Sequence, residues 1–219
     1  MKTTTKMEKK NKPTDGAIEK RVITVGAALE RRSDDGASRK VSGYAAVFNQ
    51  FTKIGHYFEE RIAPGAFDGC NFDRCVLNFN HDNSQLLART SSETLRLKVD
   101  EKGLYFEADL PDTTLAGDIL KLIERGDITG CSFAFVVRAS EWKWISDEDP
   151  SKLDQRTITE ISEVYDVSVV THPAYEQTSV DARSAELARQ EHLEQLAERD
   201  RATFERECRE RELQFIKTR

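Results

Sequence analysis

The sequence predicts a protein of the α+β or mainly β class, with strands closed like a barrel, a few helices and one long charged helix at the C-terminal end. Short segments in which apolar and polar residues alternate, as they do in strands, recur between residues 21 and 171. Helical spacing is clear in only one central segment, residues 113–125. After residue 184 the chain lacks glycine and proline and consists mainly of Glu, Arg, Gln, Leu and Ala, which favours an exposed helix.

The expected strands are short and are separated by turn signals. Residues 94–99 and 104–110 are expected to pair as a hairpin, because their apolar residues alternate with polar ones. The first two strands are also expected to form a hairpin, across an Asp-Asp-Gly turn. A short helix is expected after residues 64–67, and an acidic loop within residues 141–154. The expected strands are residues 21–25, 40–48, 58–62, 75–79, 94–99, 104–110, 132–138, 157–161 and 163–171.

The central helix is predicted over residues 113–125. Its apolar residues Leu115, Ile119 and Ile123 fall on one face of a helix, which would pack on the sheet. Gly126 follows the last helical residue and fits a C-terminal cap.

Charge divides the chain into three parts. Charged residues make up 33% of the sequence, against an average of about 25%, and the excess lies near the two ends. Residues 1–20 are rich in Lys and Thr and are expected to form a disordered arm. Residues 21–180 are expected to form the folded domain, and residues 181–219 a charged helical tail that is solvated or binds a partner.

Composition also restricts the partners. The net charge of −6 argues against nucleic acid, which proteins bind mainly through a basic face. Residues 1–12 lack the apolar core of a signal peptide and no run is long enough to cross a bilayer, so no membrane partner is expected. Cys70, Cys75, Cys131 and Cys208 form no Cys-x-x-Cys pair and are expected to be free thiols in a reducing compartment.

A histidine, a serine and an acid each stand beside a strand-like apolar run. His81 follows the strand of residues 75–79, Ser132 follows Gly130 at the start of a strand, and Asp166 precedes Val-Ser-Val-Val. A serine hydroxyl becomes an effective nucleophile when a base lies within hydrogen-bond reach and a further group orients that base. Histidine has the near-neutral pKa that a general base needs. The pattern therefore indicates a serine hydrolase with Ser132 as nucleophile, His81 as base and Asp166 as acid.

The residues leave alternatives to the acid. A buried carboxylate needs a partner, and Asp166 could pair with an arginine, such as Arg138 or Arg156, in place of a histidine. Glu163 is a rival acid from the same region. If Asp166 faces the site, strand alternation puts Ser168 on the same face and Glu163 on the other.

A metal site is a further alternative. Cys70, Cys75 and His81 lie close together in the sequence and are possible ligands. A fourth ligand with suitable spacing is absent nearby, and the two cysteines are further apart than in most zinc knuckles. We therefore expect ordinary cysteines, with no metal and no cofactor.

Five short segments stand in a specific order: Tyr-Ala-Ala-Val-Phe at 44–48, Glu-Arg-Ile-Ala-Pro-Gly-Ala-Phe at 60–67, Asn-His-Asp at 80–82, Gly-Cys-Ser at 130–132 and Val-Ser-Val-Val-Thr-His-Pro-Ala at 167–174. In this order and spacing they resemble the HK97-type prohead (capsid maturation) serine proteases of tailed bacteriophages, which are related in fold to the herpesvirus assemblins. The resemblance covers about residues 22–179. The chain departs from the family at Ala134, where the family usually has a glycine.

The resemblance implies a serine endopeptidase with a herpesvirus-protease-like closed β-barrel. It would cleave the scaffold or the precursor of the major capsid protein, and then itself, inside the immature capsid in the host cytoplasm. Ser132 takes the position of the nucleophile, His81 that of the base, and Asp166 that of the acid before Val-Ser. Herpesvirus relatives use a second histidine instead, which makes His172 the runner-up, and they act as dimers, so a homodimer is possible.

Two other functions are compatible with the sequence. A scaffolding or capsid-assembly protein could keep the protease fold without its activity, because the acidic balance and helical tail suit that function equally well. A metal-dependent hydrolase would instead use the two cysteines near His81. In the protease interpretation, the charged tail directs the enzyme to its assembly partners or is removed by self-cleavage.

Overall fold

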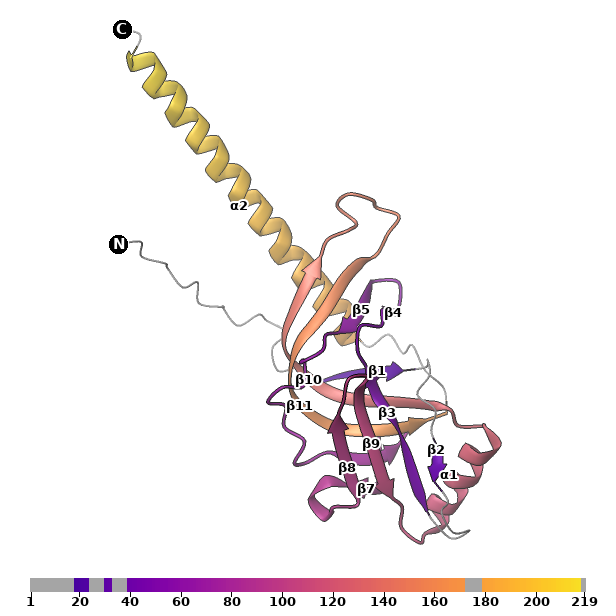
Figure 1. The fold of residues 1–219 in the computed structure, drawn as a ribbon. Coiled ribbons are helices and arrows are strands. Elements are labelled where there is room, and N and C mark those ends of the chain that lie inside the picture. The colour runs from indigo at the N-terminus through magenta and orange to yellow at the C-terminus, as the bar shows by residue number, and fades with distance from the viewer. Residues whose placement is uncertain (1–17, 24–29, 33–38, 172–178, 218–219) are drawn as a thin grey trace. The chain divides into compact units, whose positions relative to one another are not determined.

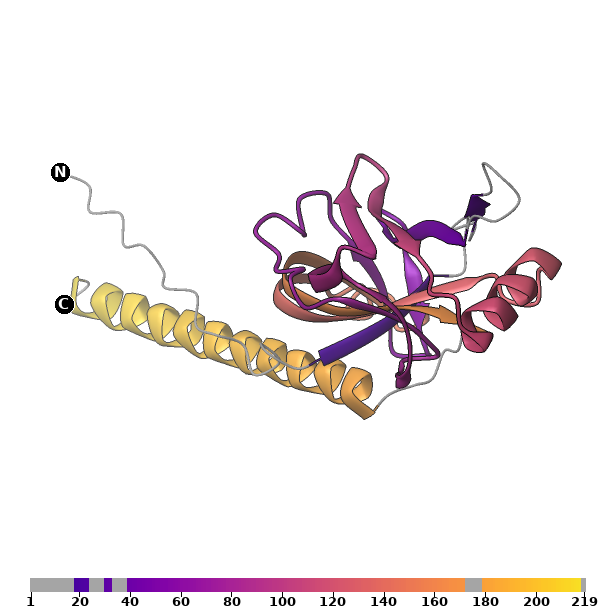
Figure 2. The same cartoon turned by 90° about the horizontal axis from the view of Figure 1, so that it is seen from below.

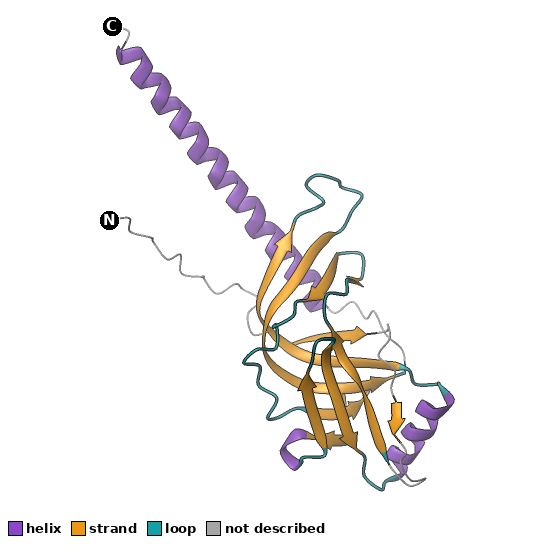
Figure 3. Cartoon of the chain, viewed as in Figure 1, coloured by secondary structure: helices purple, strands orange, loops and turns teal. Residues whose placement is uncertain are grey.

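The computed structural model describes four stretches of the chain, which are residues 18–23, 30–32, 39–171 and 179–217. The chain divides into two compact units, Met1–Gln177 and Thr178–Arg219. The first unit consists mostly of strands and the second of one helix (Figures 1 and 3). The fold is therefore mixed α/β with sheet as its main component, in agreement with the predicted class.

The larger sheet of the first unit has seven strands and is organised around the hairpin of β10 and β11. Its strand order is β1-β10-β11-β5-β4, and β6 pairs with both β11 and β7. β10 and β11 are antiparallel, whereas β5 and β6 lie parallel to β11 along two separate parts of it. The bounds are β1 (Ile18–Ile23), β4 (Thr52–Ile54), β5 (Phe58–Ile62), β6 (Val76–Phe79), β7 (Asp82–Arg89), β10 (Gly130–Lys143) and β11 (Asp154–Val170).

β11 is a single strand of 17 residues, where the sequence predicted two strands separated at Ser162. Its pairing with β10 continues through several β-bulges. One bulge makes Tyr165 an extra residue on β11, between the positions opposite Ala134 and Phe135. The bulges accommodate residues that have no partner in the regular register. The strand therefore continues past the predicted break.

The smaller sheet has the strand order β2-β3-β9-β8. Its β8–β9 hairpin confirms the prediction for this segment. The hairpin predicted for the first two strands is wrong: β1 pairs with β10 of the larger sheet, and β3 pairs with β2 and β9. Local alternation predicts that a strand exists, but burial against distant strands selects its partner. The bounds are β2 (Glu30–Arg32), β3 (Lys40–Val47), β8 (Leu95–Val99) and β9 (Gly103–Asp109).

The hydrophobic core takes side chains from both sheets. Phe133, Phe135 and Val167 of the larger sheet and Leu104 and Phe106 of the smaller sheet are completely buried and belong to one cluster. The rings of Phe133 and Phe135 stack with their centroids 4.4 Å apart. The strands that carry these residues are therefore anchored by apolar packing.

The predicted central helix is present as α1 (Thr114–Arg125), next to β2 in Figures 1 and 2. The Thr113 side chain accepts a hydrogen bond from the backbone N–H of Ala116 at 3.3 Å, which caps the first turn. Gly126 ends the helix with φ +77°, a conformation that glycine adopts at low cost. A short 3₁₀ turn, η1 (Thr90–Ser92), joins β7 to β8.

The second unit contains the helix α2 (Ser179–Lys217), which includes residues 181–217 of the predicted charged tail. Its exposed residues include Leu193, Leu196 and Phe204. Neither α1 nor α2, the α-helices of the described residues, is both long enough and apolar enough to cross a membrane.

Other expectations need correction. Residues 64–69 form turns and no helix, because Gly65 and Gly69 both have positive φ. The short strands β2 and β4 and the longer strand β7 were not expected. β1 begins at Ile18, so the last residues of the predicted N-terminal arm belong to the sheet. A closed barrel is not found among the described strands, which pair as two separate sheets.

Candidate active site

Three elements of the larger sheet bring His81, Ser132 and Asp166 together. Ser132 lies near the start of β10 and Asp166 in the last third of β11, which runs beside it. The cross-strand partners are Ser132 with Ser168 and Ala134 with Asp166. His81 lies in the tight connection between β6 and β7, and β6 pairs with β11 through the same segment, residues 166–169. Residues separated by tens of positions in the chain thus meet on neighbouring strands.

The three side chains form one series of hydrogen bonds. His81 Nδ1 lies 2.6 Å from Asp166 Oδ1, and His81 Nε2 lies 2.6 Å from Ser132 Oγ. An ionised carboxylate only accepts hydrogen bonds, so the proton of the neutral ring is placed on Nδ1. Nε2 then has a free lone pair directed at the serine hydroxyl. This arrangement can remove the hydroxyl proton when Oγ attacks a carbonyl carbon.

The backbone around His81 is held in an unusual conformation. Asn80 and His81 have φ of +52° and +57°, in the left-handed region. The Asn80 N–H donates to the Val169 carbonyl at 3.0 Å, and the Thr171 N–H donates to the Asn80 side-chain oxygen at 3.1 Å. These contacts attach the β6–β7 connection to the end of β11. They fix the position of the His81 backbone, from which the imidazole ring extends.

Ser168 adds a second support that the sequence did not assign to the site. Its hydroxyl accepts a hydrogen bond from the backbone N–H of His81 at 2.7 Å. The same hydroxyl donates to the Asn78 side-chain oxygen. Ser168 and Asn78 are completely buried, and they are cross-strand partners on β11 and β6. The signal was present in the alternation that puts Ser168 on the face of Asp166.

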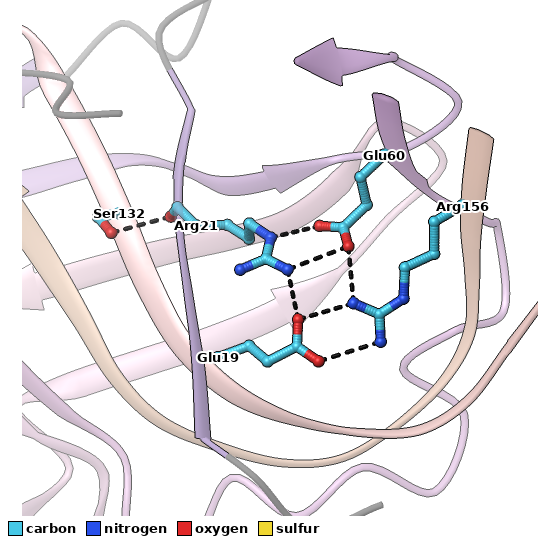
Figure 4. Close-up of polar contacts among 5 residues, drawn as sticks. All are labelled: Glu19, Arg21, Glu60, Ser132 and Arg156. Carbon is cyan, nitrogen blue, oxygen red and sulfur yellow. Dashed lines mark hydrogen bonds and ion pairs between the residues drawn. The ribbon is translucent and has the colours of Figure 1, made fainter. Parts of the chain in front are cut away.

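The nucleophile position is covered by strand β1. Ser132 is completely buried, and Val22 of β1 is its partner on the other side of β10. The Ser132 hydroxyl donates to the backbone carbonyl oxygen of Arg21 at 2.9 Å (Figure 4). A peptide carbonyl therefore lies directly beside the serine oxygen in this structure.

Next to this contact lies a buried cluster of four charged side chains, which we call the charged quartet: Glu19, Arg21, Glu60 and Arg156 (Figure 4). Sequence reasoning missed it, although strand alternation contained a signal. Glu60 shares its face of β5 with Phe58 and Ile62, both buried, so it had to be buried as well.

The alternatives for the acid find less support. Arg156 does not pair with Asp166 but bonds Glu19 and Glu60. Arg138 lies 3.8 Å from Glu160 at the surface. The carboxylate of Glu163 bonds the Tyr165 hydroxyl and raises the pKa of that tyrosine. His172 lies outside the described residues.

The described residues also offer no metal site. No group of three or more His, Cys, Asp or Glu side chains among them is arranged to hold an ion. Burial raises the pKa of Cys70 to about 12 and raises that of Cys75 further. A thiol must lose its proton to become a good ligand, so these cysteines fit poorly with the alternative metal set.

The sequence was also compared with known proteins. A family model described as caudovirus prohead serine protease matches residues 27–193. This chain belongs to that family. The match confirms the resemblance and includes His81, Ser132 and Asp166. No match was found among curated proteins or among solved structures.

The family match begins after one structural feature of this chain. Strand β1, Ile18–Ile23, lies before the first matched residue. The carbonyl that contacts Ser132 and two members of the charged quartet, Glu19 and Arg21, thus come from outside the matched region. Their contacts describe this chain and do not follow from the family.

Proposed function

We propose that this protein is an active serine endopeptidase that cleaves the scaffold or the precursor of the major capsid protein during maturation of a phage capsid. The observation that supports it best is the series of hydrogen bonds from Asp166 through His81 to Ser132. The protein would act inside the immature capsid, in the host cytoplasm. It would also cleave itself, and a homodimer is compatible with the proposal.

The proposed reaction proceeds through an acyl-enzyme. His81 Nε2 accepts the hydroxyl proton while Ser132 Oγ bonds to the scissile carbonyl carbon. The bond from that carbon to nitrogen then breaks, and His81 gives the proton to the leaving amine. Water, deprotonated by His81, hydrolyses the ester in the second half. Asp166 keeps the proton on Nδ1 and stabilises the imidazolium that forms in each half.

Residues next to the three side chains hold His81 in position for these steps. Ser168 fixes the backbone of His81, and the tight connection to β7 limits movement of the ring. The peptide segment to be cleaved would lie along β10, where its carbonyl can reach Oγ. The helix α2 supplies a charged surface that would bind the scaffold or capsid protein before the shell closes.

Co-expression with the capsid protein encoded by the same phage tests the proposal. We expect mass spectrometry to find the processed capsid protein with the wild-type enzyme and only the intact precursor with Ser132→Ala. Ser140→Ala is the matched control, because it removes a hydroxyl from the same strand, β10, well beyond the site. Normal processing by the Ser132→Ala variant would refute the assignment.

A second candidate is an assembly protein that keeps the fold but has no activity. The complete burial of Ser132 under β1 favours it, because a buried hydroxyl does not reach a substrate. A serine-directed phosphonate separates the two candidates when it is applied during co-expression with the capsid protein. Covalent labelling of the wild-type chain, with none of Ser132→Ala, supports the protease.

A further inference from the structure

β1 occupies the strand position next to the nucleophile. It pairs antiparallel with β10 over Ile18–Ile23, directly opposite the serine. Peptide segments are often recognised in this way, because the backbone hydrogen bonds of an added strand give affinity and the side chains give specificity. The Arg21 carbonyl oxygen, 2.9 Å from Ser132 Oγ, belongs to the peptide bond between Arg21 and Val22. This bond is the part of β1 that contacts the nucleophile.

The hydroxyl of Ser132 has two acceptors for one proton. It can donate to the Arg21 carbonyl oxygen at 2.9 Å or to His81 Nε2 at 2.6 Å. While the hydroxyl donates to the carbonyl oxygen, His81 cannot accept the proton and the site is inactive. When the proton turns to His81, a lone pair of Oγ becomes free beside the same carbonyl group. Both arrangements require only rotation of the hydroxyl hydrogen.

The side chains of β1 are recognised by two opposite charges. The Arg21 guanidinium bonds Glu60 through Nε and, at 3.1 Å, through Nη2. The Glu19 carboxylate accepts two hydrogen bonds from Arg156, at 2.8 and 3.0 Å. The two β1 side chains also bond each other. Residues two apart on one strand thus meet one carboxylate and one guanidinium, as Figure 4 shows.

The two residues that bind the side chains of β1 come from other strands of the larger sheet, β5 and β11. Glu60 and Arg156 are partners in the parallel pairing of β5 and β11 and bond each other at 3.0 Å. This contact does not involve β1. Together they present an acceptor for a basic residue and a donor for an acidic residue. Their charges are complementary to those of Glu19 and Arg21 of β1, and the quartet is neutral as a whole.

The burial of the quartet makes this recognition selective. Glu19, Arg21, Glu60 and Arg156 are each less than a tenth exposed. Burial alone would raise the pKa of Glu19, but Arg21 and Arg156 outweigh it and hold that pKa below its ordinary value. Burial alone would lower the pKa of Arg156, but Glu60 and Glu19 keep it above its ordinary value. A strand with an uncharged residue in either position would leave the buried cluster with a net charge of one unit.

We propose that β1 is bound as a substrate, that the enzyme cleaves the bond between Arg21 and Val22, and that Glu60 and Arg156 select segments of the pattern Glu-x-Arg. The proposal rests on the proposed function. It names the residues that determine specificity and the class of substrate: extended segments with a basic residue before the cleaved bond and an acidic residue two positions earlier.

The self-cleavage step is balanced by groups already present and by water. Ser132 Oγ bonds to the Arg21 carbonyl carbon and passes its proton to His81. The bond from that carbon to the Val22 nitrogen breaks, and His81 returns the proton to this nitrogen, which becomes a new N-terminus. Water then hydrolyses the ester on Arg21. Residues 1–21 leave as a peptide, and the edge of β10 that paired with them can take other segments of the same pattern.

The first test follows the full-length chain after purification by mass spectrometry. We expect a product that begins at Val22, with no such product from Ser132→Ala. Glu19→Gln and Arg21→Gln should each slow its formation about tenfold or more, because each removes a charged hydrogen-bonding partner. Lys20→Gln removes one positive charge from the same strand, as Arg21→Gln does, and is the matched control, expected to cleave within about twofold of wild type.

The second test uses a synthetic peptide of residues 16–27 as substrate in trans, and it separates recognition from folding. With the wild-type enzyme, Arg→Gln at position 21 of the peptide should lower kcat/KM about tenfold or more. With Glu60→Gln the same change in the peptide should matter less than about threefold, because the carboxylate that reads it is gone. A purely structural quartet predicts no such change in preference.

Failure of this inference differs from failure of the proposed function. If the enzyme processes the capsid precursor but leaves the bond after Arg21 intact and ignores both charges of the peptide, β1 is a structural strand and the inference is wrong. If the precursor itself is not processed, the proposed function is wrong.

Discussion

The two sheets of the domain bury different kinds of side chain. The smaller sheet buries apolar residues such as Val41, Leu104 and Phe106, and Ser42 is the one buried polar side chain in its described part. The larger sheet buries Ser132 and Asp166 of the candidate site, their supports on β6 and β11, and the whole charged quartet. Both sheets share one core, yet one is built for packing and the other carries nearly all of the polar chemistry.

This difference indicates which sheet carries the residues of the candidate site and what their burial costs. A buried polar group costs free energy unless it is fully paired, and a buried charge costs more. The larger sheet accepts these costs and offsets them with specific hydrogen bonds, from Asp166 to Ser132 and within the quartet. Substitutions in the larger sheet should therefore change activity or unpair charges, whereas substitutions in the smaller sheet should change only stability.

The largest effect is expected from Asp166→Asn. The amide has the size of the carboxylate but disfavours the proton on Nδ1, and it cannot stabilise an imidazolium. In serine protease triads this exchange lowers kcat about 10⁴-fold, and we expect a loss of that order in single-turnover cleavage of the capsid precursor.

Asp82→Asn is the control for that variant. Asp82 follows His81 directly but bonds Ser84 at the exposed start of β7. It should keep nearly wild-type activity and stability. If Asp166→Asn retained more than a tenth of the wild-type rate, Asp166 would not orient the base.

The next effect separates a buried ion pair from an exposed one. Arg156→Met leaves Glu19 and Glu60 with one guanidinium fewer in a buried cluster, so the free energy of unfolding should fall by about 3–5 kcal/mol. Arg138→Met removes the same charge from a surface pair with Glu160, 3.8 Å apart, and should cost less than about 1 kcal/mol. Urea unfolding measures both, and equal values for the two variants would contradict the difference.

In the smaller sheet, we expect a loss of stability where two backbones approach closely. A Cβ on Gly103, at the start of β9, would lie 2.0 Å from the carbonyl oxygen of Ala46 on β3. Gly103→Ala should therefore lower the free energy of unfolding by about 2 kcal/mol or more, measured by thermal or urea unfolding. The folded fraction should cleave its substrate at the normal rate, because the site lies in the other sheet.

Gly69→Ala is the matched control for the clash. Gly69 also has positive φ, +76°, but a Cβ there would meet no atom within 4 Å. It should show only the cost of the left-handed conformation, about 1 kcal/mol. If both variants lost the same free energy of unfolding, the close approach of β9 to β3 would not explain the need for glycine at position 103.

The sequence predicted best what depends on neighbours in the chain. Ser132, His81 and Asp166 each stand next to a strand-like segment, and Thr113 and Gly126 bracket a helix with a clear apolar face. These signals lie within a few residues of the positions they describe, so they can be read without knowing the fold.

The partners of the strands could not be read in the same way. Six residues of β1 contain nothing that distinguishes pairing with β10, more than a hundred residues away, from pairing with β3. The charged quartet depends on that pairing, because it joins residues from β1, β5 and β11. Alternation could have shown that Glu60 and Arg156 are buried, but only the tertiary fold brings Glu19 and Arg21 to them.

The smallest effect tests whether the larger sheet also positions its residues through the backbone. Ser168→Ala removes the acceptor of the His81 N–H and the donor to Asn78, both buried. We expect kcat to fall about tenfold with KM nearly unchanged, and the free energy of unfolding to fall by about 1 kcal/mol. Ser168→Thr keeps the hydroxyl and should restore most of kcat.

Ser162→Ala removes a hydroxyl of the same strand that bonds the Val136 carbonyl at 3.3 Å, and should affect stability alone. A loss of stability without loss of kcat in Ser168→Ala would mean that the connection from β6 to β7 positions His81 by itself.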